Sequence, residues 1–146
     1  MPDIAANAFA IAFGDFRRGY LIADRQGIGS EAYVQMKFAL DHGRLGRALM
    51  MHNFHRNVET PAADFTGAMA ITNSAPHEFD VVRLVLGTEY ASIAAWQPKR
   101  SDALVAPVVM VLETVDGQVV NIEINNNAAC GYDVRAELVG EAGSIA

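Results

Sequence analysis

The sequence has little of several residue types. Its 146 residues include one cysteine, Cys130, which excludes an internal disulfide. The only lysines are Lys37 and Lys99, and acidic residues outnumber basic ones by 17 to 11, giving a formal net charge of -6. This balance argues against nucleic acid or an acidic membrane as a partner. The apolar stretch from Ile4 to Phe13 is too short to span a bilayer, and no basic segment precedes it as in a signal peptide. We therefore expect a cytoplasmic location.

Two amphipathic helices are predicted. In the first, Glu31 to His42, apolar residues recur at helical spacing, and Gly43 stands where a C-terminal cap belongs. In the second, Ser74 is a good N-cap with Glu78 just inside, and the helix extends to Gly87. Between them, residues 61–69 are either a loop or a short irregular helix.

The rest of the chain favours strands. Asp116-Gly117 is the strongest hairpin signal, and apolar and polar residues alternate along the segment that follows it. This pattern predicts an α+β fold, an open and mostly antiparallel sheet with helices packed on one face, whose other face is polar. The predicted strands cover Arg47 to Asn57, Tyr90 to Pro98, Pro107 to Val115, Gln118 to Asn126 and Tyr132 to Val139.

The N-terminal segment has a different character. Residues 4–12 are compatible with a short helix or a strand, and residues 19–26 alternate like a strand. Residues 11–28, IAFGDFRRGYLIADRQGI, resemble a late part of tailed-phage major capsid proteins. Gly29-Ser30 follows, a dipeptide that a common cloning site also encodes. We interpret residues 1–28 as a capsid-like segment, residues 29–30 as a junction and the whole chain as a chimera, with a mis-joined sequence as the alternative.

Residues 31–146 resemble the C-terminal domain of the Gfo/Idh/MocA oxidoreductases, most closely the inositol 2-dehydrogenase branch. The resemblance is carried by four fragments in the same order: ALDHGRLGRALMMHNFHRN, MAITNSAPHEFDVVRLVLG, QPKRSDA and GYDVRAELVGEAG. It implies a domain that binds substrate and associates into homo-oligomers through the open face of its sheet.

The resemblance also implies hydride transfer to a nicotinamide cofactor, for which we find no binding motif in this sequence. Members of the family bind NAD or NADP in a Rossmann domain, which also supplies a lysine in a Glu-Lys-Pro motif. This sequence has neither that motif nor a G-x-G-x-x-G fingerprint after a strand. We therefore expect no cofactor on this chain, and no hydride acceptor without one.

The family's catalytic Asp and His, four residues apart, fall on Asn73 and His77. In the family the His accepts the proton of the substrate hydroxyl. Asn73 can hydrogen-bond a hydroxyl, but it lacks the negative charge that would raise the basicity of an imidazole. From the residues alone, a histidine bonded locally at a helix start is the favoured reading of His77. We describe the pair as vestigial.

Three further residues match positions that contact the polyol or frame it: His55, Asn57 and Tyr132. The spacing of His55 and Asn57 puts them on one strand face, and without the family match we expect them to line the solvated face. Cys130 is expected to be a small buried side chain. No metal site is predicted, because His52 and His55 point to opposite faces of the strand.

Two functions follow from these observations. The first is a folded chimeric domain with no evolved activity of its own, derived from the substrate-binding and oligomerisation domain of a polyol dehydrogenase. The second is a subunit fragment of an NAD-dependent inositol or sugar oxidoreductase, active only with a Rossmann partner. An assembly module of capsid type is disfavoured, since 28 residues cannot bury a capsid core.

Overall fold

A computed structural model describes residues 30–58 and 64–146. The elements predicted over residues 4–12 and 19–26 lie outside this part of the chain. The described elements are α2 (Ser30–Asp41), β1 (Ala48–Arg56), α3 (Gly67–Asn73), α4 (Ala75–Leu86), β2 (Tyr90–Trp96), β3 (Val108–Thr114), β4 (Val119–Asn125), β5 (Asp133–Gly140) and β6 (Gly143–Ile145).

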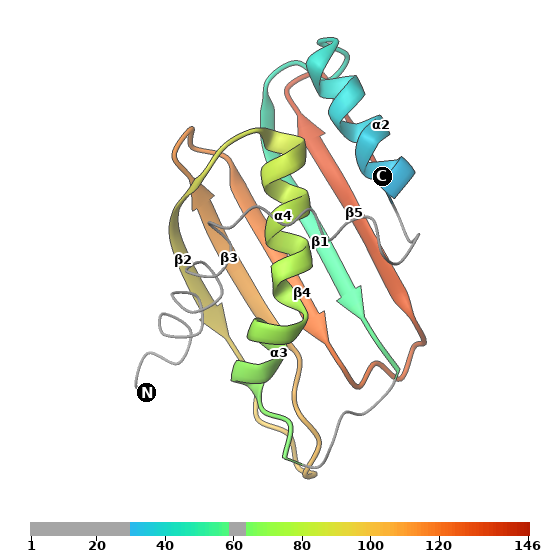
Figure 1. Cartoon of the computed structure of the whole chain (residues 1–146), viewed down its shortest axis with the longest axis vertical. Helices are drawn as coiled ribbons and strands as arrows, with labels where there is room; N and C mark the ends of the chain where they lie inside the picture. The colour runs from blue at the N-terminus through green and yellow to red at the C-terminus, as the bar shows by residue number, and fades with distance from the viewer. Residues whose placement is uncertain (1–29, 59–63) are drawn as a thin grey trace.

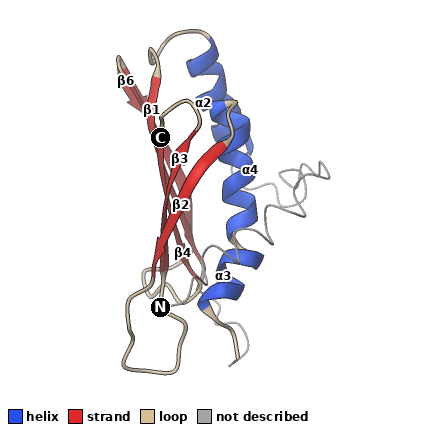
Figure 2. Ribbon diagram, turned by 90° about the vertical axis from the view of Figure 1, so that its left-hand side faces the viewer, coloured by secondary structure: helices blue, strands red, loops and turns tan. Residues whose placement is uncertain are grey.

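The strands form one open sheet in the order β2-β3-β4-β1-β5-β6. β1 and β4 are parallel neighbours, and every other neighbouring pair is antiparallel. The three described helices lie together on one face of the sheet, and no described helix covers the other face (Figure 1, Figure 2). The predicted α+β fold and its mostly antiparallel open sheet are therefore confirmed.

The helices bury the stripes that their spacing predicts. In α2, Tyr33, Met36 and Ala39 are buried against the sheet. α4 ends at Gly87, whose φ of 67° is the left-handed conformation that glycine adopts at little cost, and its N–H bonds the carbonyl of Arg83. The apolar stripe of α4 consists of Ala75, Phe79, Val82 and Val85. Together with the covered face of the sheet, these stripes make the core.

The beginning of α4 departs from the prediction. Ser74 occupies the predicted position before the helix, but its side chain makes no capping hydrogen bond. Its N–H bonds the carbonyl of Ala70 in α3, because α3 runs almost directly into α4. Pro76 in the first turn has no N–H to be capped. The hydroxyl of Ser74 instead accepts a 3.3 Å hydrogen bond from Nδ2 of Asn126.

The uncovered face of the sheet is only partly polar. On β1, β4 and β5 it carries charged and amide side chains, as predicted. Towards β2 and β3 it exposes Trp96 and Val109, and beside the centre Met50 and Val119. The expectation of a polar face is thus correct only in part, because outward positions of β1, β2, β3 and β4 also carry large apolar side chains. None of the helices in the described ranges has the length and apolar character needed to cross a lipid bilayer.

Candidate functional site

The direction of the β1 side chains decides where the predicted histidines lie. Met51 and Asn53 are completely buried beneath the helices, so the next residue with the same parity, His55, also faces the helical layer. His52 faces the open side and contacts Oδ1 of Asn121. The opposite directions predicted for His52 and His55 are confirmed. The expectation that His55 lines the solvated face is wrong, because the buried Met51 fixes the parity of the strand.

His55 pairs with an acidic residue of the helix above it. Its Nδ1 lies 3.0 Å from Oε1 of Glu78, and the side chains are 18% and 3% exposed respectively. Glu78 is so deeply buried because it belongs to the stripe of α4 that packs on the sheet. A carboxylate can only accept hydrogen bonds, so Nδ1 of His55 is the donor when Glu78 is ionised.

Several buried polar atoms on the same elements as this pair have no hydrogen-bond partner among the described residues. Within the described chain, Oε2 of Glu78 and both amide atoms of Asn53 are buried without a hydrogen-bond partner. Tyr33 of α2 is also near, since its pKa is raised first by burial and then by the charges of Glu78 and Tyr132. The region between α2, β1 and α4 is therefore a polar patch inside an otherwise apolar layer, which is unusual in a folded domain.

The α3–α4 junction carries the predicted pair Asn73 and His77. Asn73, the last residue of α3, is exposed and accepts a 3.2 Å hydrogen bond from the hydroxyl of Thr72. His77 lies in the first turn of α4, partly exposed and directly before Glu78. Its neighbour on the helix flank, Asp80, has a raised pKa because desolvation outweighs the opposing charges of Arg83 and His77.

The remaining predicted residues lie at the same end of the sheet. Since β1 and β4 are parallel, their carboxyl ends meet at one edge, and antiparallel β5 begins there (Figure 1). Asn57, just after β1, donates its N–H to Asn125 over 2.7 Å and accepts from the N–H of Ala128 over 2.9 Å. Tyr132, directly before β5, is 52% exposed.

The junction and this edge are connected. Asn126, at the end of β4, bonds Ser74 between the two helices, and His55, near the end of β1, bonds Glu78 beside His77. The elements that carry the five predicted site residues thus converge from two layers on one edge of the sheet. This edge is the candidate site.

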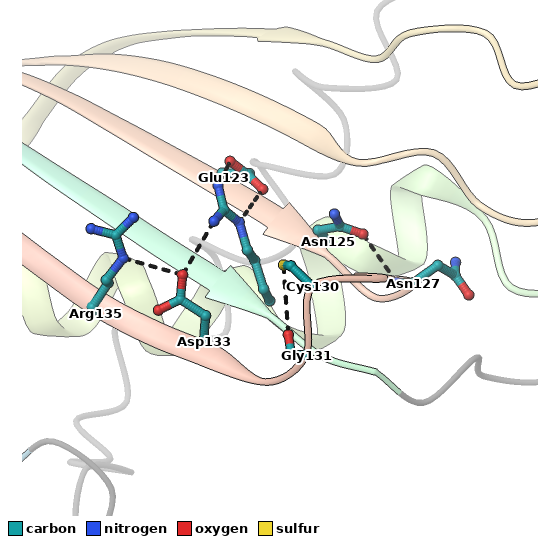
Figure 3. A network of polar contacts seen from close by, with 8 residues as sticks. Glu123, Asn125, Asn127, Cys130, Gly131, Asp133 and Arg135 are labelled. Atoms are coloured by element: carbon teal, nitrogen blue, oxygen red, sulfur yellow. Dashed lines mark hydrogen bonds and ion pairs between the residues drawn. The ribbon is translucent and has the colours of Figure 1, made fainter.

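The opposite face of the same strands carries a separate ionic network. Arg56 bonds Glu123 through two contacts of 2.7 and 2.8 Å, and it reaches Asp133 over 3.2 Å. Asp133 also accepts from Arg135 over 3.1 Å (Figure 3). The hydrogen bond to Glu123 is the largest cause of the raised pKa of Arg56. Asp133 is therefore occupied by open-face ion pairs, whereas its neighbour Tyr132 is not among them.

Cys130 lies in the turn between β4 and β5, beside Gly131 (Figure 3). Its side chain is exposed. The expectation of a buried thiol is wrong: Cys130 is exposed, although Asn126 and Ala128 earlier in the same turn are buried.

Two of the three described helices, α2 and α4, begin with a turn that disfavours the pyrophosphate of a nicotinamide dinucleotide. A pyrophosphate favours a helix N-terminus with free N–H groups and no negative charge. Here the first turn of α2 contains Glu31 and that of α4 contains Glu78. Lys37 is paired with Asp41 on the exposed side of α2 at 3.1 Å, and Lys99 lies in an exposed loop. Across residues 30–58 and 64–146, no group of three or more His, Cys, Asp or Glu side chains is placed to hold a metal ion.

Known proteins match the chain over this region. The model of the GFO/IDH/MocA C-terminal domain matches residues 33–146. The chain belongs to this family. Inositol 2-dehydrogenase 2 of Saccharopolyspora erythraea is 47% identical over 119 residues, which cover 78% of this chain and 34% of that enzyme. Inositol 2-dehydrogenase of Streptomyces avermitilis is 44% identical over 154 residues, covering 99% of this chain and 43% of the relative.

The family's solved structures share the fold. Myo-inositol dehydrogenase from Lactobacillus casei, solved in complex with NAD(H) and myo-inositol, superposes with a TM-score of 0.72 at 30% identity. The match covers 80% of this chain and 35% of that structure. The chain thus spans well under half the length of these GFO/IDH/MocA relatives.

From the sequence we did not predict that the side chains of Glu78 and Asn53 are buried. Glu78 looked like an ordinary acidic residue at a helix start, where negative charge is favourable. A signal for its burial was present, because it falls between Ala75 and Phe79 in the apolar stripe of α4. Asn53 shares the parity of Met51 on β1, which likewise indicates a buried polar side chain.

Proposed function

We propose that this chain is the polyol-binding part of an NAD-dependent dehydrogenase of the inositol type. The observation that supports it best is the convergence of β1, β5 and the α3–α4 junction on one edge of the sheet. This edge carries His55 and Asn57, Asn73 and His77, and Tyr132. The Lactobacillus casei relative, which binds myo-inositol, has the same fold in this domain.

Each residue has a chemical task in this proposal. His77, partly exposed at the start of α4, accepts the proton of the hydroxyl that is oxidised. Asn73 accepts or donates a hydrogen bond to the polyol but does not add negative charge beside His77. His55, Asn57 and Tyr132 offer further hydrogen bonds to ring hydroxyls. The contacts of His55, Asn57 and Tyr132 orient the polyol, whereas His77 takes part in the proton transfer.

None of these side chains can accept the hydride that leaves the polyol carbon. Nicotinamide cofactors supply the hydride acceptor in dehydrogenases, and the acidic first turns of α2 and α4 support the proposal that another part of the enzyme binds the cofactor. We therefore expect the purified chain to bind myo-inositol without oxidising it.

Two measurements test this function. Isothermal titration with myo-inositol is expected to show saturable binding, and its absence would overturn the proposal. Absorbance at 340 nm, followed with the chain, myo-inositol and NAD, is expected to stay flat. A catalytic rise would show that the chain binds the cofactor after all and would refute this part.

Self-association through the open face of the sheet belongs to the same proposal. Trp96 is 59% exposed there and Val109 36%, and such apolar area on a sheet face favours burial against a second copy. Light scattering after size exclusion is expected to show an oligomer that Trp96→Asp weakens. Val34→Asp, on the exposed side of α2, is the control and leaves the oligomer intact. A monomeric wild type contradicts this arrangement.

The chimeric, non-catalytic domain is the second hypothesis. The Gly29-Ser30 dipeptide and the capsid-like residues 11–28 favour it. The Streptomyces avermitilis match, which covers 99% of the chain, supports a single origin instead. Amplification of source DNA across the codons of residues 25–35 separates the two: one continuous product supports a single gene, and only unlinked products support a chimera.

A further inference from the structure

Glu78 is the sequence neighbour of His77 on α4 and the contact partner of His55 on β1. It directly precedes Phe79 in the buried stripe of α4 and directly follows His77, so the side chains of residues 77 and 78 leave the helix about 100° apart. One therefore remains partly exposed at the edge, while the other turns down to β1 and meets His55.

We propose that Glu78 is a positioning residue for polyol binding, which holds Nδ1–H of His55 so that Nε2 is presented to a substrate hydroxyl. This inference rests on the proposed function. The carboxylate fixes both the orientation of the ring and the nitrogen that carries the proton, because it can accept but not donate.

Geometry and burial support this role over that of an ordinary surface pair. The Nδ1–Oε1 distance is 3.0 Å, and the carboxylate is only 3% exposed. At an exposed site water would compete for both partners, and the ring would turn freely. Here the neighbours are buried, so the ring has few alternative orientations. The 18% of the His55 side chain that stays exposed leaves it within reach of a ligand.

The proposal also accounts for the polar excess around the pair. Oε2 of Glu78 and the amide of Asn53 remain buried without partners in the described chain. Such groups lower the stability of the fold, so their presence here favours a functional role. An apolar pair at these positions would pack at least as well. The ionisable group that contacts His55 is Glu78 from α4, and the charge of Glu78 also acts on Tyr33 from α2.

The test compares two variants that make the same chemical change. Glu78→Gln keeps the size of the side chain but removes the obligatory acceptor. Glu123→Gln makes the same substitution in the ionic network on the opposite face of the sheet. The first readout is the ¹⁵N shifts of the His55 ring across a pH series without ligand. The second is the affinity for myo-inositol by titration calorimetry.

In the wild type and in Glu123→Gln, we expect a protonated Nδ1 on His55 and equal affinity for myo-inositol. In Glu78→Gln, we expect a changed ring tautomer and about tenfold weaker binding, typical of a lost hydrogen bond to a charged group. Wild-type ring shifts and affinity in Glu78→Gln would overturn the role of Glu78 while leaving the proposed function standing.

The other outcomes are equally decisive. If the wild type shows a Glu78-dependent ring state but does not bind myo-inositol, the proposed function fails, and the substrate role of Glu78 fails with it. If Glu78→Gln does not fold, His55→Gln takes its place, with the same tenfold loss expected. Wild-type affinity in that variant would also overturn the proposal.

Discussion

Both faces of β1 carry pairs of basic and acidic side chains, but the two sets of pairs differ in their surroundings. On the open face, Arg56 forms ion pairs with Glu123 and Asp133, and it shares the ring of Phe54 with Arg135. On the covered face, His55 has a single acidic partner, Glu78, which lies under a helix. In the open network Arg56 and Asp133 each have two ionic partners, whereas the covered pair leaves polar atoms unsatisfied.

This difference separates stability from function. Surface networks lose little when one member is removed, because the others and water compensate. A covered polar pair that is only partly satisfied stabilises the fold poorly, so its presence in a core indicates a ligand or a catalytic task. This difference supports the two proposals made above, polyol binding on the covered side and self-association through the open side.

Adjacent valines of β4 offer the largest expected contrast. Val120 is fully buried on the covered face, whereas Val119 is 37% exposed on the open face. Val120→Ala is expected to lower the free energy of unfolding by about 2–3 kcal/mol, through lost burial and a residual cavity. Val119→Ala is expected to cost less than about 1 kcal/mol. Urea titrations of both variants check this, and equal losses would contradict the two-face description.

The unsatisfied amide of Asn53 gives an effect of opposite sign. Asn53→Leu removes two unpartnered polar atoms from a fully buried position, so stability is expected to rise by about 1–2 kcal/mol. Asn121→Leu on the open face, which loses the contact with His52, is expected to be neutral or mildly destabilising. Thermal unfolding of both checks this, and a strongly destabilised Asn53→Leu would mean that Asn53 is satisfied in solution.

The raised pKa of Asp80 gives a pH-dependent prediction. Desolvation raises the pKa of Asp80 in the folded chain above its ordinary value of 3.8, so stability is lost as pH rises through that range. Asp80→Asn is therefore expected to stabilise the protein at pH 7 and to have no effect near pH 3. Asp133→Asn, which breaks two ion pairs, should not stabilise at pH 7. Unfolding at both pH values is the measurement, and a pH-independent effect of Asp80→Asn would refute it.

The smallest effect is expected in the open-face network. Glu123→Gln removes the carboxylate that Arg56 contacts, but Asp133 remains its partner. The loss should stay below about 1 kcal/mol and shrink further in high salt. Denaturant titrations at low and high salt, with the protein dilute enough to be monomeric, measure it. A loss of several kcal/mol that salt does not change would contradict a surface-type network.

Much of the fold is predictable from the sequence because local rules agree with one another here. The period of the α2 stripe, Gly87 after α4 and the Asp116-Gly117 hairpin each fix an element, and the structure confirms all three. The alternation of β1 also carries information, namely which of its side chains face the helices. Met51 is buried, and counting by twos from it places His55 beneath the helices rather than in solvent.

Other features depend on contacts between distant segments. Ser74 has the residue type of an N-cap, yet the continuity of α3 and α4 and the position of Asn126 decide its bond. A small apolar residue such as Cys130 is often buried, yet within the turn between β4 and β5 Ala128 is buried and Cys130 is exposed. The partnership of Glu78 with His55 spans 23 residues and two layers, so helix rules alone do not reveal it.

Binding of myo-inositol at the end of β1 and β4 can be mapped on the backbone amides by NMR titration. We expect concentration-dependent shifts at Asn57, Asn73, His77 and Tyr132, with little change at the open-face residues Trp96, Glu123 and Arg135. Shifts confined to the open face, or none at saturating polyol, would contradict the proposed binding.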